Sequence, residues 1–157
     1  MVIHEDLRQA MAAATAACWV SNCSPSGVPD LVRTSGTRVE PGHEHLVAYV
    51  PVPYGQLLIA NLVPGGKLAL LLADVHSNLS FQFKGRLVSH RPSNGEELAF
   101  QRRYVEDFCR EIEKQGMVGW ELLFPVYFRQ PSLALVMRVE EVYEQTPKAG
   151  TGERIYF

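Results

Sequence analysis

The chain has 157 residues, of which 46% are hydrophobic, a length and composition that suit one domain with its own core. Fifteen basic and seventeen acidic residues give a formal net charge of -2, which argues against general nucleic-acid binding and against attraction to anionic membranes. The apolar runs are too short to cross a bilayer, and acidic residues near the N-terminus do not suit a signal peptide, so we expect a cytoplasmic protein.

The cysteines are odd in number and none forms a CxxC pair. Cys18, Cys23 and Cys109 have no spacing typical of a zinc site. The sequence therefore predicts reduced thiols and no metal site.

The first half of the chain predicts short elements separated by turns. Residues 4–14 combine early acidic side chains with good helix formers and predict an N-terminal helix. Residues 15–22 and 28–37 flank a Ser-Pro-Ser-Gly turn and predict a hairpin. A third strand at residues 45–52 is ended by prolines, and a short helix is expected within residues 54–63.

The second half predicts longer elements. The apolar run at residues 67–73 is typical of a central strand buried on both faces. A strand beginning at residue 79 and a long helix at residues 96–115 come next, while residues 120–128 are aromatic and give no clear pattern. Residues 132–144 predict a long strand, and residues 145–157 an extended tail.

The strand that begins at Leu79 alternates most sharply. Phe81, Phe83 and Leu87 are expected to face a core, which leaves Gln82, Lys84 and Arg86 together on the other face. This polar face fits an anionic, hydrogen-bonding ligand, but it also fits the solvated face of any half-exposed strand. Gly85 within the strand indicates a bulge or the close approach of a backbone or ligand.

A second polar face occurs in the hairpin. Arg33 and Ser35 are expected to share one side of the strand with Leu31, while Val32 and Thr34 point to the other side. Because the strands are joined mostly by hairpins and lack a regular βαβ alternation, the sequence predicts a single, mainly β domain over residues 1–157, an antiparallel barrel of about six strands with flanking helices.

Five short segments occur along the chain in a characteristic order: Gly27-Val28-Pro29, Val32-Arg33-Thr34-Ser35-Gly36-Thr37-Arg38-Val39, Leu57-Leu58-Ile59-Ala60-Asn61-Leu62, His76-Ser77-Asn78 leading into Gln82-Phe83-Lys84-Gly85, and Val142-Tyr143-Glu144-Gln145-Thr146-Pro147. In these segments the chain resembles, nearly end to end, the pyridoxamine 5′-phosphate oxidase-like superfamily of FMN-binding split barrels, in particular its short bacterial members.

The resemblance implies a six-stranded split β-barrel that forms a homodimer, with FMN in a groove between the subunits. Flavin contacts are implied for seven residues: Arg33, Ser35, Gln56, His76, Ser77, Gln82 and Lys84. Arg33 and Ser35 are expected near the phosphate or ribityl end, and Gln82 and Lys84 near the ring or phosphate. A surface ion pair for Arg33, a turn cap for Ser77 and an exposed loop position for His76 are the alternatives.

The sequence departs from true pyridoxamine 5′-phosphate oxidases at two places. The helix after the third strand begins Tyr54-Gly55-Gln56-Leu57, without the cations of the family's phosphate motif, and the C-terminal Arg-x-His element is absent. We therefore do not expect oxidation of pyridoxamine phosphate.

Three functions stay open at this point. The first is an FMN-dependent oxidoreductase with an unidentified small-molecule substrate and no nominated catalytic residue. The second is a non-catalytic flavin-, haem- or deazaflavin-binding module, in which His76 or His90 would be the candidate haem ligand. The third is a dimeric scaffold with an empty groove.

Overall fold

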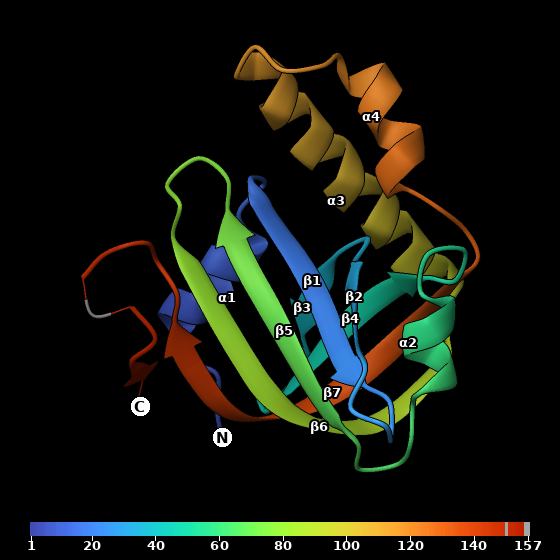
Figure 1. Ribbon diagram of the computed structural model, residues 1–157. Helices are drawn as coiled ribbons and strands as arrows, with labels where there is room; N and C mark the ends of the chain where they lie inside the picture. Colours follow the sequence, from blue (N-terminus) through green and yellow to red (C-terminus); the bar gives the residue numbers. More distant parts are fainter. Residues whose placement is uncertain (150, 156–157) are drawn as a thin grey trace.

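The computed structural model describes residues 1–149 and 151–155. One antiparallel sheet of eight strands curves around an apolar interior, with helices on its outside and at one end (Figure 1). The strands are β1 (Ala16–Cys23), β2 (Pro29–Arg33), β3 (Thr37–Val39), β4 (His45–Pro51), β5 (Lys67–Asp74), β6 (Ser80–Pro92), β7 (Ser132–Glu144) and β8 (Arg154–Ile155). The helices are α1 (Glu5–Ala12), α2 (Gln56–Ala60), α3 (Gly95–Lys114) and α4 (Trp120–Tyr127).

The prediction of a mainly antiparallel β fold with flanking helices is confirmed, but the expected number of strands is wrong. The sheet has the order β2-β1-β5-β6-β7-β4-β3, and β8 pairs with β7. The hairpin strand expected over residues 28–37 is divided into β2 and β3, and part of the expected extended tail forms β8. No helix in the described residues is long and apolar enough to cross a membrane.

The division lies at residues 34–36, where the chain crosses between the two edges of the sheet. The Thr34 backbone N–H donates to the Cys18 carbonyl in β1. On the other side, the Ser35 N–H donates to the carbonyl of Tyr49 in β4, and the Tyr49 N–H donates to the Gly36 carbonyl. Gly36 has φ +133°, which side-chain-bearing residues rarely adopt. The crossing therefore joins both edges and leaves the barrel split between β2 and β3.

The core occupies the concave side of the sheet. It includes Val20, Leu70, Phe83 and Leu135, each at most 1% exposed. The N-terminal helix α1 contributes the buried Leu7 and Met11 to this same cluster; other members are Ile3, Cys18, Leu46, Leu58, Leu72 and Val142. The alternation of β6 is confirmed, because Phe83 and Leu87 are buried while Lys84 and Arg86 are exposed.

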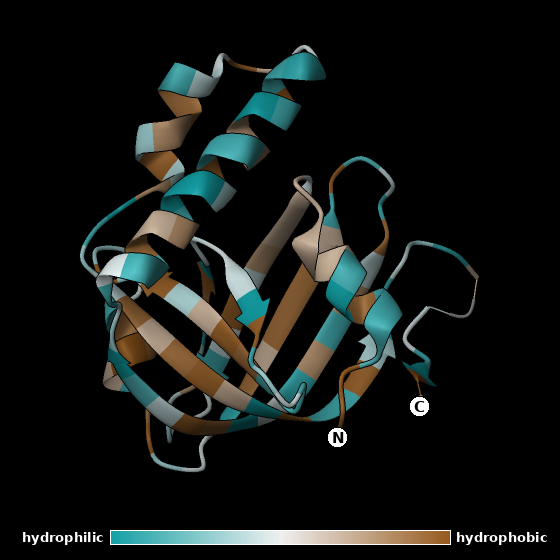
Figure 2. Cartoon of the chain, turned by 180° about the vertical axis from the view of Figure 1, so that it is seen from behind, coloured by the Kyte–Doolittle hydropathy of each residue, from teal (hydrophilic) through white to brown (hydrophobic). Residues whose placement is uncertain are grey.

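Helices α3 and α4 cover part of the convex side of the sheet (Figure 1). Near the start of α3, Phe100 packs on Val47 and Tyr49, and farther along Phe108 packs with Ala17 of β1. As a result β4 is buried on both faces. The strand expected over residues 67–73 was predicted to be buried in this way, but the convex face of β5 is only half-buried, so that prediction is wrong. Figure 2 shows the apolar strands of the barrel wall beside the largely hydrophilic α3.

Candidate functional site

The convex face carries a row of side chains that crosses five strands, from the edge of helices α3 and α4 to the open part of the face. The backbone pairing aligns Arg33 of β2, Trp19 of β1, Leu71 of β5, Gln82 of β6 and Tyr143 of β7. Paired residues in antiparallel strands point to the same face, so these side chains form one line. Within this row, the apolar side chains of Trp19 and Leu71 lie between the Arg33 guanidinium and the Gln82 amide.

The next row runs parallel to the first, toward the end of β1. It aligns Leu31, Ser21, Ala69, Lys84 and Glu141. Ser21 and Ala69 are the small residues at its middle, and they leave space above the sheet. The loss of side-chain volume there explains why the surface is hollowed at this point.

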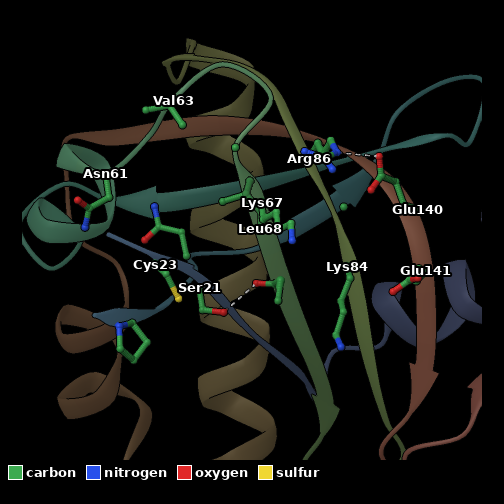
Figure 3. A pocket seen from close by; sticks show the side chains of 15 residues that line it. Ser21, Cys23, Asn61, Val63, Lys67, Leu68, Lys84, Arg86, Glu140 and Glu141 are labelled. Atoms are coloured by element: carbon green, nitrogen blue, oxygen red, sulfur yellow. Dashed lines mark hydrogen bonds and ion pairs between the residues drawn. The ribbon is translucent and has the colours of Figure 1, made fainter. Parts of the chain in front are cut away.

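A pocket of about 740 Å³ opens at this hollow (Figure 3). Its volume lies within the range of roughly 300 to 1,000 Å³ found for small-molecule sites. Labelled lining residues are Ser21 and Cys23 of β1, Asn61 and Val63 after α2, Lys67 and Leu68 of β5, Lys84 and Arg86 of β6, and Glu140 and Glu141 of β7.

A β-bulge brings both glutamates to the pocket. Lys84 pairs with Glu141 while the next residue, Gly85, pairs with Val139, so Glu140 is the extra residue in β7. Arg86 forms an ion pair with Glu140 at 3.2 Å. Glu141 forms one with Arg154 at 3.2 Å. The carboxylates at this edge of the pocket are therefore already neutralised.

Gly85 is explained by the same bulge. A Cβ at this position would lie 2.0 Å from the Arg138 carbonyl oxygen. The sequence predicts a bulge or a close approach at this glycine, and both occur, with the backbone of β7 as the approaching group.

Arg33 lies at the boundary between the open groove and the helices. Its guanidinium carbon is 4.1 Å from the centroid of the Tyr127 ring and 4.3 Å from that of Phe108, with Trp19 at 5.4 Å. Stacking on rings engages the flat face of a guanidinium and leaves its N–H groups at the edge. No hydrogen bond or ion pair joins the Arg33 side chain to any other described residue, so a ligand can use those donors.

The structure does not bring Ser35 to this groove. Its side chain is fully buried, and its hydroxyl donates to the Tyr127 carbonyl oxygen at 3.2 Å. Ser35 was expected near the phosphate or ribityl end of a flavin, but its hydroxyl forms a structural bond between the sheet crossing and the end of α4.

His76 and Ser77 lie in the β5–β6 turn, at the end of β5 remote from Lys67. Asp74 Oδ1 accepts the backbone N–H groups of His76 at 2.8 Å and Ser77 at 2.9 Å. Burial raises the pKa of Asp74, but hydrogen bonds from Thr15 and the turn outweigh it, and the net pKa is lowered. The Ser77 hydroxyl in turn accepts the Leu79 backbone N–H at 3.3 Å, which is the turn-capping contact given above as the alternative for Ser77.

Gln56 and the candidate haem ligands also lie away from the pocket. Gln56 is an exposed residue at the start of α2, and the pocket instead contacts Asn61 beyond the end of that helix. His76 and His90 lie at opposite ends of β6, and neither lines the pocket.

Of the seven residues expected to contact a flavin, the structure thus gathers Arg33, Gln82 and Lys84 on one face. Sequence reasoning missed Ser21 and Lys67. Ser21 alternates with buried neighbours in β1, so its sequence context could have placed it on the polar face. Lys67 could not have been found in this way, because only the strand register places it opposite Arg86.

The cysteines are all unpaired, as predicted. Burial raises the pKa of Cys18 to about 11 and that of Cys109 to about 11, so both thiols are protonated at neutral pH. Cys23 is exposed and lies at the pocket.

No protein-family model and no curated protein matches this sequence. Several solved structures share its fold. HupZ from Group A Streptococcus is 16% identical, with a TM-score of 0.56 over 97% of this chain and 99% of that one. An FMN-binding protein from Syntrophomonas wolfei is 12% identical, with a TM-score of 0.52 over 87% of this chain and 82% of that one.

A candidate pyridoxamine 5′-phosphate oxidase from Lactobacillus delbrueckii is 14% identical, with a TM-score of 0.51 over 90% of this chain and 93% of that one. At such identities the likeness concerns the fold alone. The split-barrel fold implied by the sequence resemblance is thereby confirmed.

Proposed function

We propose that this split-barrel protein binds FMN in the groove on its convex face and acts as a flavin-dependent oxidoreductase on a small molecule. The observation that carries the proposal is the row from Arg33 to Gln82. A flavin combines a flat apolar ring, a hydrogen-bonding ring edge and an anionic phosphate, and this face offers a partner for each.

The residues fit the group as follows. Trp19 and Leu71 provide half-buried apolar surface at the middle of the row, against which a ring can pack. The Gln82 amide, one strand away, supplies a donor and an acceptor for the ring edge. Arg33 and Lys84 supply positive charge on either side. The flavin would contribute hydride or electron transfer, while the protein binds it, orients it and excludes water.

We further propose that two copies of the chain face each other across this groove. Large apolar side chains stand exposed at it: Leu31 of the second row is 61% exposed, and Val63, which lines the pocket, is 55% exposed. A partner subunit would cover them and close the groove over the ring. The shared fold of the FMN-binding protein from S. wolfei supports the choice of flavin.

The absorption spectrum of the purified protein tests the cofactor directly. Bound flavin gives bands at about 370 and 450 nm, whereas haem gives a Soret band. We expect flavin bands, either as isolated or after adding FMN. A colourless protein that fails to bind added FMN, or one that carries only haem, contradicts the proposal. Reduction of the bound flavin by NADH or NADPH would then identify the electron donor.

Replacing Arg33 with methionine is expected to weaken FMN binding by about 10- to 100-fold, because one charge-assisted hydrogen bond contributes about 1.5 to 3 kcal/mol. Methionine retains packing against Phe108 and Tyr127. The matched control is Arg110→Met, since Arg110 also stacks on an aromatic ring, 4.1 Å from the centroid of Trp120. Equal loss of affinity in both variants, measured by flavin fluorescence titration, would place the ligand elsewhere.

A further inference from the structure

Two asparagines on the pocket wall each carry a buried polar atom without a partner. Asn22 of β1 is only 7% exposed, and Asn61 directly follows α2; both line the pocket. Asn22 Oδ1 and Asn61 Nδ2 are buried, and neither has a hydrogen-bond partner in the part of the chain that the structure describes. Because buried polar groups in native proteins are nearly always bonded, this acceptor and this donor indicate an absent third group.

The roles of the two atoms are set by one backbone carbonyl in α2. Asn22 Nδ2 donates to the Leu58 carbonyl oxygen at 2.9 Å, so the other end of this amide has to be the oxygen. The Asn61 backbone N–H donates to the same carbonyl at 3.2 Å, which occupies its second lone pair. Leu58 therefore cannot satisfy the Asn61 side chain, and the wall presents one free acceptor and one free donor.

The surroundings of the two amides are apolar on one side and charged on the other. Pro29 and Val63 line the pocket with exposed side chains, against which a ring can pack. Glu140 and Glu141 stand across the pocket from Asn61 (Figure 3). Lys67 also lines the pocket and forms no ion pair with another described residue, so an anion is the alternative ligand that a test has to exclude.

We propose that this end of the pocket binds a planar ligand with a primary carboxamide group. The ligand N–H would donate to Asn22 Oδ1, and the ligand C=O would accept from Asn61 Nδ2. A carboxamide carries a donor and an acceptor in one plane and is complementary to both atoms, whereas a ketone lacks the donor and a carboxylate lacks it and adds charge. Asn61 is half-buried, so a rotation of its side chain opens the site to the ligand.

The binding itself does not require a flavin. Unsatisfied buried groups cost free energy that the ligand recovers whether or not the neighbouring groove is occupied. Only the role of the ligand rests on the proposed function: the nicotinamide ring of a hydride donor carries a primary carboxamide and would lie beside the flavin.

The test compares three pyridines of similar shape, without flavin, by protein-observed NMR titration. Nicotinamide offers the N–H and the C=O, 3-acetylpyridine offers the C=O alone, and nicotinate offers a charged carboxylate. We expect nicotinamide to bind about 5-fold or more tighter than each of the others, because either analogue leaves Asn22 Oδ1 without a donor.

The variant Asn61→Leu tests the donor. It should weaken nicotinamide and 3-acetylpyridine equally, by about 5- to 20-fold, and the preference for nicotinamide should persist because it comes from Asn22. The matched control is Gln115→Leu, since Gln115 is an exposed amide directly after α3, as Asn61 is after α2, and lies outside the pocket. It should bind all three pyridines like the unaltered protein. Should Asn61→Leu not fold, the comparison of ligands on the unaltered protein still decides.

Four results would contradict the proposal or its premise. Nicotinate binding as tightly as nicotinamide would show an anion site, and equal binding of 3-acetylpyridine would show that an internal water alone satisfies Asn22. A loss of riboflavin affinity in Asn61→Leu as large as the loss for nicotinamide would show that the amides hold the flavin ring. Failure of the unaltered protein to bind FMN, with the preference for nicotinamide intact, overturns only the proposed function.

Discussion

Replacing Gly85 with alanine is expected to destabilise the protein by about 3 kcal/mol or more. The new Cβ would lie 2.0 Å from the Arg138 carbonyl oxygen and 3.2 Å from the Val139 Cα, and neither is a flexible side-chain end. The two strands must separate at the bulge, which disrupts their pairing. For a chain of this length the melting temperature should fall by about 6 to 12 °C.

The control for this prediction is Gly95→Ala. Gly95 is the first residue of α3, and a Cβ there meets nothing within 4 Å. Alanine is a better helix former than glycine, so this variant should be as stable as the parent or slightly more stable. Chemical denaturation of both variants checks the pair, and a Gly85→Ala protein as stable as Gly95→Ala would show that β6 and β7 are farther apart than described.

Replacing Glu97 with alanine is expected to cost about 3 kcal/mol of unfolding free energy. The Glu97 side chain is fully buried and accepts two hydrogen bonds from Arg91, at 2.7 and 2.8 Å. It also pairs with Arg38 at 3.2 Å and accepts the Asn94 backbone N–H at 2.9 Å, completing the cap of α3. Alanine removes all of these bonds and leaves a void at the start of the helix.

The contribution of Glu97 should depend on pH. Hydrogen bonds from Arg91 lower its pKa more than burial raises it, so the folded-state pKa lies below the usual value of about 4.3. The stabilisation is therefore present above about pH 4.3 and lost as the pH falls through the folded-state pKa.

Urea unfolding of the parent and of Glu97→Gln at several pH values measures this dependence. The difference in stability should be largest near neutral pH and should shrink on acidification. Glu96→Gln, an exposed neighbour in the same helical turn, serves as control and should behave like the parent. A difference between parent and Glu97→Gln that is constant down to pH 2 would exclude this linkage.

Long elements with clear periodicity are predictable from the sequence alone. The strand expected over residues 132–144 is β7 with the same bounds, and the long helix differs from α3 by one residue at each end. The same periodicity correctly separated Phe83 and Leu87 from Lys84 and Arg86. Such patterns show which face of an element is buried, and this information is contained in the sequence of that element alone.

Features that depend on two distant segments were not predictable in this way. Residues 34–36 continue the alternation of β2, yet they leave it to bond with Cys18 on one side and Tyr49 on the other. Helix α4 is almost uniformly apolar or aromatic and contains Pro125, so its sequence shows no helical stripe. The pocket likewise requires the pairing of Lys67 with Arg86, which no local pattern reveals.

The crossing at residues 34–36 also affects how copies of this protein can associate. It leaves the two terminal strands of the sheet short: β2 has five residues and β3 has three. At the edge strand β2, Pro29 lacks a backbone donor and Asp30 carries a charge, both of which disfavour the addition of another strand. Growth of the sheet from one molecule into the next is therefore disfavoured at β2, so the convex-face contact proposed above, which uses side chains, does not compete with strand addition at this edge.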